Sequence, residues 1–261
     1  MRIPLFHVDA FTSKLFSGNP AAVCLPEKRL DDELMQSIAA ENNLSETAFL
    51  VPEEDELHIR WFTPVTEVAL CGHATLAAAF ILIEQLKWFE NTIAFQTRTS
   101  GTLTVQRRNG LFEMDFPGTQ CSSFQSPSEL EDGLGLKPKN VFSAGEDIMA
   151  VFDSEQQIRD LKPDMSLLTS VACRGVIATA RGETSDFVSR FFAPRVGVAE
   201  DPVTGSAHCA LAPYWSNILG KTRLHAKQAS QRGGELFCEA RGDRVLIGGQ
   251  AVLYSEGMIK L

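Results

Sequence analysis

Residues 60–74 of the chain read RWFTPVTEVALCGHA, and a related stretch, RFFAPRVGVAEDPVTGSA, spans residues 190–207. The first five residues of the two stretches lie 130 positions apart, and their shared Gly-x-Ala endings lie 133 positions apart. The second offset also relates Gly101 to Gly234. An ordered series of matches at a nearly constant spacing indicates an internal repeat, so we predict two halves with one topology.

Each predicted half combines several strands with one apolar helix. The first half covers residues 1–118 and the second covers residues 119–261, whose last strand can cross back to the first half. The boundary follows residues 116–118 (FPG), because the composition then turns to Ser, Gln and Pro. We expect helices at residues 72–88 and 205–219, the second one ended by Gly220. Strands are expected at residues 58–62, 92–97, 102–107, 111–116, 189–192, 235–239 and 244–247.

This arrangement of elements predicts the fold class. Strands crowded around one apolar helix favour a mixed α/β (α+β) fold, in which each half is a curled, mostly antiparallel sheet around its central helix. Two such pseudo-symmetric halves would face each other across a cleft, with the starts of both helices turned towards it.

The overall composition excludes two classes of partner. The chain has 261 residues and a formal net charge of −9, which does not suit a phosphate backbone, so nucleic acid is not expected as a partner. Its most apolar window, LAAAFILI at residues 76–83, is far shorter than the roughly 18 residues that cross a membrane. Residues 1–11 also lack the features of a secretory signal. We therefore expect no membrane association and a cytoplasmic location.

The cysteines and the missing cofactor motifs limit the chemistry to the chain's own side chains. No C-x-x-C pair occurs among the six cysteines, so we expect unpaired thiols and no metal site. The glycine-rich dinucleotide motif, the Walker A motif, H-E-x-x-H and G-x-S-x-G are also missing from the sequence. No cofactor is therefore expected. The cysteines stand at positions 24, 71, 121, 173, 209 and 238.

Both predicted helices begin with a glycine that is followed by a small or polar residue. The first amides of a helix have no partner inside it and lie at the positive end of its dipole, so they can bind a carboxylate or a phosphate. Ordinary capping by Thr204 and a tight turn at Gly72 explain either start taken singly, but the repeated pair favours a binding site. The candidate side chains nearby are Cys71, His73, Asp201 and Ser206, together with Glu46 at the start of the predicted strand 47–51. His208, two residues beyond Ser206, is expected to be structural.

Several motifs in a fixed order resemble those of the PhzF-like family of phenazine biosynthesis proteins. The runs that carry this resemblance are SETAF at residues 45–49, CGHAT at 71–75 and DPVTGSAH at 201–208. The opening segments DAF at 9–11 and GNPAAV at 18–23 agree with it, as does RGG at 232–234. The similarity therefore extends over nearly the whole chain.

The resemblance implies a diaminopimelate-epimerase-like fold, a homodimer and an isomerase that moves a proton without metal or cofactor. The best-understood members act on a dihydro-hydroxyanthranilate, whereas the substrate of this chain is left open. By motif, Glu46 is similar to the general acid/base, and His73 and Asp201 are similar to residues that manage protons and contact substrate. The implied substrate-binding residues are Gly72, Cys71, Gly205 and Ser206.

Two alternatives to a cofactor-independent isomerase stay open. The related epimerases and racemases use two cysteines, one at each helix start, but here only Cys71 matches and Thr204 takes the second place. A threonine hydroxyl is too weak an acid to replace a thiolate in this chemistry, which argues against a racemase. Cys71 is then either a small buried residue or a thiol whose pKa the helix start lowers. The other alternative is a catalytically silent ligand-binding or interaction protein of the same fold.

Overall fold

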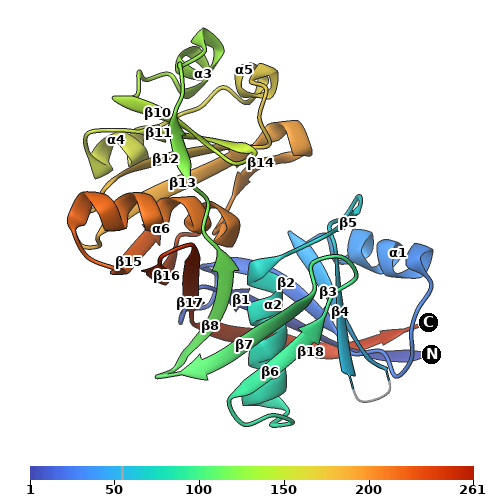
Figure 1. Ribbon diagram of the computed structural model, residues 1–261. Coiled ribbons are helices and arrows are strands. Elements are labelled where there is room, and N and C mark those ends of the chain that lie inside the picture. Colours follow the sequence, from blue (N-terminus) through green and yellow to red (C-terminus); the bar gives the residue numbers. More distant parts are fainter. Residues whose placement is uncertain (54–55) are drawn as a thin grey trace. The chain divides into compact units, whose positions relative to one another are not determined.

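The two ends of the chain pair with each other. β1 (Arg2–Ala10) and β18 (Ala251–Lys260) run antiparallel along their whole length, with one irregularity in register between His7 and Val8. Figure 1, a ribbon view of the computed structural model, shows both termini at the same end of this pair. The last strand therefore crosses back to the start of the chain.

This pairing decides how the chain divides. The structure describes residues 1–53 and 56–261. One compact unit comprises Met1–Asp115 together with Gly248–Leu261, and the other comprises Phe116–Ile247. The final strand thus belongs to the first unit. The prediction places it in a second half of residues 119–261 but allows it to cross back to the first.

The first unit is a mostly antiparallel sheet curled around one helix. Between its terminal strands it contains β2 (Asn19–Cys24), α1 (Asp32–Asn42), β3 (Glu46–Glu53), β4 (Glu56–Phe62), β5 (Glu67–Val68), α2 (Gly72–Phe80), η1 (Ile81–Gln85), β6 (Thr92–Gln96), β7 (Thr102–Arg108) and β8 (Leu111–Pro117). The pairs β1–β2, β3–β4 and β6–β7 are antiparallel, and β2–β3 is parallel. The central helix α2 contacts β1, β2, β3, β7 and β18, so strands surround it.

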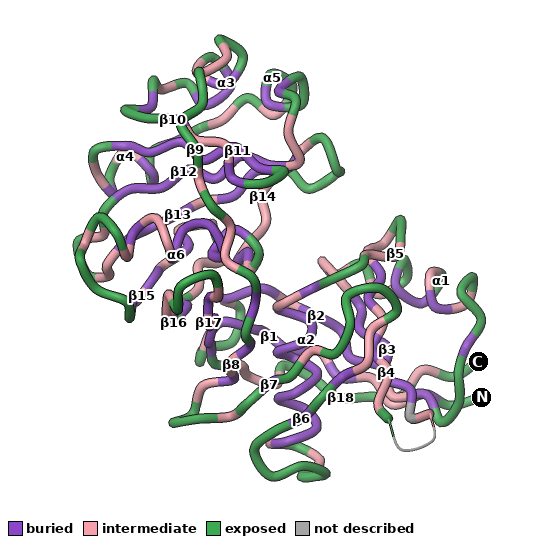
Figure 2. The backbone as a smooth tube through the Cα atoms, in the orientation of Figure 1, coloured by how far each residue is buried: buried purple, intermediate pink, exposed green. Residues whose placement is uncertain are grey.

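Burial on every side explains the composition of α2. All of its residues from His73 onwards are buried, and Ala77, Ala78 and Ala79 expose no surface (Figure 2). Side chains as small as alanine let several strands pack closely against one helix. Any larger side chain in this run must therefore displace the surrounding sheet.

The central helix of the first unit is shorter than its sequence predicts. α2 passes into the π-helical turn η1, in which the Leu86 amide donates to the Ile81 carbonyl oxygen at 2.9 Å. Lys87 then has a φ of 55°, outside the helical region, and the helix ends. The predicted helix end at Trp88 is therefore wrong.

The second unit has the same plan with additional helices. It contains β9 (Cys121–Ser123), α3 (Ser128–Leu134), β10 (Asn140–Ala144), β11 (Asp147–Val151), α4 (Glu155–Asp160), α5 (Met165–Ser170), β12 (Val176–Arg181), β13 (Phe187–Ala193), η2 (Pro194–Val196), β14 (Val198–Asp201), α6 (Gly205–Leu219), β15 (Arg223–Gln228), β16 (Gly234–Arg241) and the start of β17 (Arg244–Gly249). The pair β11–β12 is parallel, and β12–β13 and β15–β16 are antiparallel. α6 ends at Gly220, whose φ of 65° lets its amide donate to Ser216, as predicted.

The sheet of the second unit is buried on both faces. On one face, Trp215 of α6 stacks on Phe187 of β13, and its Nε1 donates to Thr179 Oγ1 at 2.9 Å. On the other face, α3, α4 and α5 contribute to a separate apolar cluster that includes Leu130, Ile158 and Leu168. None of these three short helices is predicted from the sequence.

The arginines of the two repeated stretches make the same ion pair in both units. Arg60 on β4 forms a bidentate ion pair with Glu67 on β5, with Nε and Nη2 at 2.7 and 2.8 Å from the two carboxylate oxygens. Arg190 on β13 binds Glu200 on β14 in the same way, at 2.8 and 3.0 Å. Each ion pair links a strand to the short strand before the central helix and so positions the segment that leads into the helix start.

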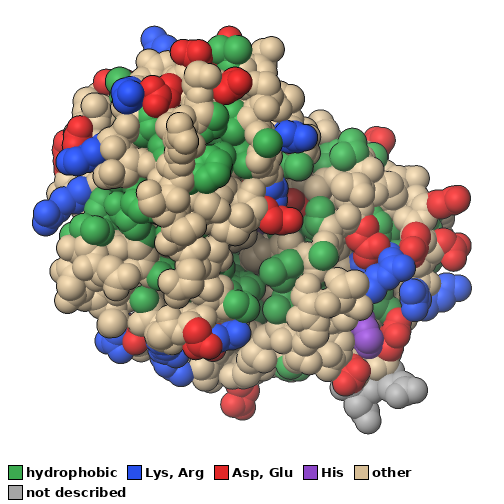
Figure 3. Space-filling model, turned by 45° about the horizontal axis from the view of Figure 1, so that its top comes forward, with side chains coloured by type: hydrophobic (Ala, Val, Ile, Leu, Met, Phe, Trp, Pro, Cys, Tyr) green, Lys and Arg blue, Asp and Glu red, His purple; other side chains and the backbone are tan. Residues whose placement is uncertain are grey.

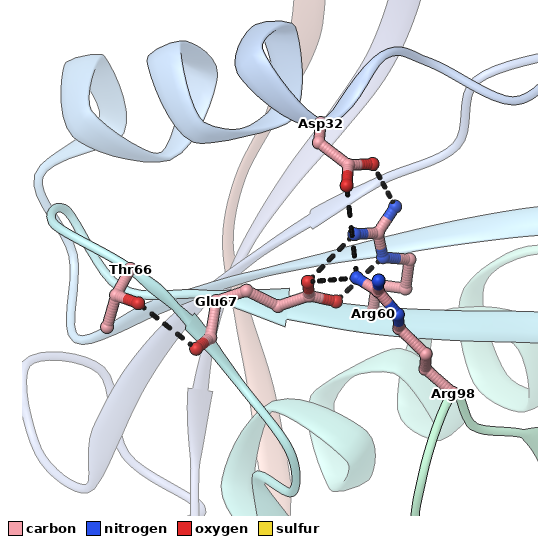
Figure 4. A network of polar contacts seen from close by, with 5 residues as sticks. All are labelled: Asp32, Arg60, Thr66, Glu67 and Arg98. Atoms are coloured by element: carbon pink, nitrogen blue, oxygen red, sulfur yellow. Dashed lines mark hydrogen bonds and ion pairs between the residues drawn. The ribbon is translucent and has the colours of Figure 1, made fainter.

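In the first unit this ion pair extends into a surface network. Figure 4 shows Asp32 and Arg98 beside Arg60 and Glu67, with Arg60 Nη1 at 2.6 Å from Asp32 and Arg98 Nη1 at 2.9 Å from Glu67. The pocket over this network has a volume of about 310 Å³ and lies along β4 and β5. It contains none of the predicted site residues.

Candidate functional site

Three predicted residues of the first unit come together at the start of α2. Glu46 is the first residue of β3 and pairs with Ala21 of β2, Cys71 is the N-cap of α2, and His73 is its second residue. His73 Nε2 lies 3.1 Å from Glu46 Oε2, and His73 Nδ1 lies 3.5 Å from Cys71 Sγ. The imidazole therefore stands between a carboxylate and a thiol.

This cluster is almost closed to solvent. The exposed fraction is 6% for Cys71 and for His73, and 19% for the side chain of Glu46. The helix start is held in place by Thr75, whose Oγ1 and amide both donate to the Cys71 carbonyl oxygen. The three side chains thus have little freedom to rearrange.

Burial and neighbouring charge act in opposite directions on His73. Burial lowers its pKa, but Cys71 and Glu46 raise it by more, so the pKa of His73 lies well above the usual value. We attribute the rise to the carboxylate of Glu46, because burial also raises the pKa of the Cys71 thiol and keeps it protonated. The pKa of Cys71 is therefore not lowered by the helix start, which is one of the two alternatives for this residue. The cluster therefore consists of a protonated Cys71 thiol and an ion pair between the His73 imidazolium and the Glu46 carboxylate.

The same three residue types can also bind a metal ion. One ligand atom from each of Glu46, Cys71 and His73 lies within 4.8 Å of the others. However, the imidazole already contacts the thiol through one nitrogen and the carboxylate through the other. The charges of the cluster are thus balanced without an ion.

In the second unit, the predicted residues Asp201, Gly205 and Ser206 lie around the start of α6. Asp201 ends β14, and Gly205 and Ser206 are the first two helical residues after the N-cap Thr204. Thr204 Oγ1 donates to Asp201 Oδ2 at 2.5 Å, so this hydroxyl is committed to the carboxylate. Both helices therefore begin at the predicted glycines, each next to an acidic residue from the predicted set.

Gln228, a residue not predicted from the sequence, holds this second group together. It is 1% exposed at the end of β15. Its Nε2 donates to the Asp201 carbonyl oxygen at 2.7 Å and to Thr204 Oγ1 at 3.1 Å, and its Oε1 accepts from the Thr204 amide at 2.9 Å. No motif surrounds Gln228, so nothing in the sequence marked it.

A second missed residue, Arg174, reaches the start of α6 from the loop before β12. Its Nη2 lies 3.2 Å from Ser206 Oγ, and its Nε and Nη2 lie 2.8 and 2.5 Å from the carboxylate of Asp147. Asp147 is 5% exposed. No motif surrounds Arg174, and the offsets of the internal repeat relate Glu46 to Val176 and Thr179 rather than to Arg174.

His208 has a structural role, as expected. It is fully buried, its Nδ1 lies 2.8 Å from the Thr204 carbonyl oxygen, and burial lowers its pKa to about 4. A neutral ring at this depth packs against Phe187. It therefore supports the helix start without facing a ligand.

All six cysteines are free. No helix in the described part of the chain is long and apolar enough to span a membrane. On the face that Figure 3 shows, Lys and Arg side chains lie among Asp and Glu side chains. The absence of a nucleic-acid partner, the homodimer and the cytoplasmic location stay predictions.

Two units with a curled sheet around a central helix define the class of protein. The same fold is found in a hydroxyproline epimerase from Agrobacterium vitis, with a TM-score of 0.65 over 99% of this chain and 92% of that chain. At 12% identity, this likeness concerns the fold alone. The predicted diaminopimelate-epimerase-like fold is thereby confirmed.

The family follows from closer relatives. Residues 8–257 match the PhzC-PhzF family, described as phenazine biosynthesis-like protein, and the chain belongs to this family. A PhzF-family structure from Enterococcus faecalis is 45% identical and superimposes with a TM-score of 0.97, covering both chains completely. An uncharacterized isomerase of Pseudomonas aeruginosa is 51% identical over the full length of both chains. The predicted class of enzyme, an isomerase, agrees with the name of this relative.

Proposed function

We propose that the protein is a cofactor-independent isomerase that moves a proton on a small carboxylate-bearing substrate. The observation that carries the proposal is the carboxylate of Glu46, held 3.1 Å from the buried imidazole of His73. A general acid/base needs a fixed position and a site from which water is largely excluded. Both conditions hold for Glu46, and the family relatives named isomerases support the reaction class.

In the proposed reaction, Glu46 removes a proton from one carbon of the substrate and returns it to another. The electron pair of the broken C–H bond moves through the conjugated system of the substrate to the carbon that is protonated last. The carboxylate becomes a carboxylic acid in the first step and is regenerated in the second, so no oxidant or reductant is consumed. His73 gives the carboxylate a fixed cationic neighbour throughout.

The second group of residues is proposed to bind and orient the substrate. The amides that follow Gly205, and the exposed hydroxyl of Ser206, suit a substrate carboxylate. Gly72 has the corresponding place at the start of α2, beside Cys71. Asp201 is proposed to manage protons on the substrate, with its orientation fixed by Thr204 and Gln228.

The racemase alternative is weaker on two observations. Burial raises the pKa of Cys71, which leaves the thiol a poor base. Thr204 at the second helix start donates its hydroxyl hydrogen to Asp201. Neither residue is therefore prepared to remove a proton from an α-carbon.

Replacement of Glu46 tests the proposal. Glu46→Gln keeps the size of the side chain but removes the exchangeable carboxyl group. We expect proton exchange into solvent deuterium to fall by about 10²–10⁴-fold, the usual loss for a general acid/base, with substrate binding retained. The assay uses a panel of small aromatic and amino acids on the wild type and the variant.

Cys71→Ala is the matched control, because Cys71 contacts the other nitrogen of the same imidazole. It should cost much less activity than Glu46→Gln. A racemase would give the reverse order, with Cys71→Ala inactive and Glu46→Gln active. A wild type that exchanges no proton with any member of the panel would favour the silent binding protein.

A further inference from the structure

The two units place oppositely charged side chains close to the start of the same parallel strand pair, although not at the same position. In the first unit, the parallel pair β2–β3 begins where Glu46 lies opposite Ala21. In the second unit, the parallel pair β11–β12 begins where Val176 lies opposite Ile148, and Arg174 precedes Val176 by two residues. Arg174 is thus the charged residue nearest to the position that corresponds to Glu46.

Each of these side chains reaches the second residue of its own central helix. Glu46 contacts His73 of α2, and Arg174 contacts Ser206 of α6. His73 and Ser206 correspond in the internal repeat, because each follows the glycine that begins its helix. The carboxylate–imidazole contact of the first unit therefore has a guanidinium–hydroxyl contact as its counterpart in the second unit.

Arg174 is rigidly held. Its Nε and Nη2 donate to the two carboxylate oxygens of the buried Asp147 at 2.8 and 2.5 Å. Its guanidinium lies over the ring of Phe191, at 5.6 Å from the ring centre. Its backbone amide donates to the Glu146 carbonyl oxygen at 2.8 Å. These contacts hold the guanidinium beside Ser206.

The contact determines which way the Ser206 hydroxyl points. Arg174 can only donate, so Ser206 Oγ must accept in this hydrogen bond at 3.2 Å. The hydroxyl hydrogen of Ser206 then remains for another acceptor, and Ser206 is exposed. By contrast, the hydroxyl of Thr204 donates to Asp201 and is already used.

A positive charge at this place does not serve the helix itself. Cations are unfavourable near a helix N-terminus, where acidic groups are preferred. Arg174 nevertheless reaches the first turn of α6, and Asp147 on β11 compensates its charge. A hydroxyl that accepts from a guanidinium is a stronger donor to an anion, because neighbouring hydrogen bonds polarise each other.

We propose that Arg174 is a positioning residue that holds the Ser206 hydroxyl as a hydrogen-bond donor to the substrate carboxylate. This inference rests on the proposed function for the nature of the bound group. Asp147 acts on the substrate only through Arg174.

The test measures binding of anthranilate and of its neutral amide, anthranilamide, together with KM and kcat of the exchange reaction. Ser206→Ala should weaken anthranilate binding by about 10–30-fold, the usual effect of losing a hydrogen bond to a charged group. Arg174→Gln should weaken it by a similar factor. Binding of anthranilamide should change little in either variant, and KM should rise more than kcat falls.

The double variant distinguishes positioning from an independent effect. If Arg174 acts through Ser206, Arg174→Gln combined with Ser206→Ala should bind anthranilate no more weakly than either single variant. Losses that multiply, or an Arg174→Gln variant that binds anthranilate like the wild type, would overturn the proposal. So would a wild type that shows no preference for the acid over the amide.

Two further variants guard against a folding defect. Arg174→Gln leaves Asp147 buried without its partner, so the same measurements are repeated with Asp147→Asn added. Arg195→Gln is the matched control, because Arg195 in the same unit binds the Val171 carbonyl oxygen and not Ser206. A wild type that prefers anthranilate through Arg174 but exchanges no proton would refute the proposed isomerase and leave this inference intact.

Discussion

At the scale of single residues, His73 is held between two groups that make its charge depend on the fold. The Glu46 carboxylate lies 3.1 Å from one ring nitrogen, and the Cys71 thiol lies 3.5 Å from the other. The folded protein therefore favours the imidazolium more than the unfolded chain does. A raised pKa of this kind contributes stability that is complete below the unfolded pKa of about 6.5 and is lost as the pH rises through the folded pKa.

We expect the free energy of unfolding of the wild type to decrease from pH 6.5 upwards until His73 has lost its proton in the folded state. His73→Gln should remove this part of the pH dependence, because glutamine does not titrate. Urea unfolding of both proteins between pH 6 and pH 10 measures the difference. Identical pH profiles for the two proteins would contradict the ion pair.

The sequence predicts some of the site residues and not others. Glu46, His73 and Ser206 stand beside glycines or at strand starts that motifs reveal. Arg174 and Gln228 have no such context, because they reach the start of α6 only after β12 and β15 have taken their places in the sheet. Their roles follow from the tertiary structure, which a short sequence pattern does not encode.

At the scale of elements, α2 has little tolerance for larger side chains. Its three consecutive alanines have no exposed surface, and strands pack on several sides of the helix. The sequence predicts the start of this helix at Gly72 but not its end, since the apolar run continues past it without Gly or Pro. The turn η1 and the positive φ of Lys87 end it instead.

Ala78→Leu should lower the free energy of unfolding by about 1–3 kcal/mol, because added methylene groups force the surrounding strands apart. Ala40→Leu is the matched control: Ala40 lies on α1 and is exposed, so the change should stay within about 0.5 kcal/mol. Urea denaturation of both variants measures the contrast. An Ala78→Leu protein as stable as the wild type would show that α2 has room around it.

The short helices of the second unit illustrate why elements are missed. α4 has six residues, too few for a helical period to stand out, and its capping box of Ser154 and Gln157 is the only local signal. α3 and α5 are similarly short and are held by a shared apolar cluster. Their stability comes from packing rather than from their own sequences.

At the scale of the whole molecule, the internal repeat determines more than any single motif. Its recurring arginine–glutamate ion pairs, its parallel strand pairs and its two helix starts repeat in both units. The repeat could be read from the sequence because its spacing is nearly constant. The pairing of the first strand with the last could not be assigned, because nothing in a strand's sequence identifies a distant partner.

Ending the chain at Gln250 removes β18, which pairs with β1 along its entire length, and leaves β1 paired with β2 alone. We expect the first unit to lose its protection, since its sheet then has an incomplete edge and α2 loses one of its covering strands. Hydrogen–deuterium exchange resolved by peptide is the measurement, with peptides from Phe116–Ile247 staying protected. Removal of Leu261 alone is the control, and a truncated protein with a protected β2–β4 region would contradict the expectation.

The same return of the chain has a consequence for how the protein is made. Synthesis proceeds from the N-terminus, and folding usually follows in that order. Here the second unit is continuous and can fold once Ile247 has left the ribosome, whereas the first unit waits for Gly248–Leu261. The unit that is translated first therefore completes its folding last, and its apolar strands are exposed to chaperones and proteases until Gly248–Leu261 has been translated.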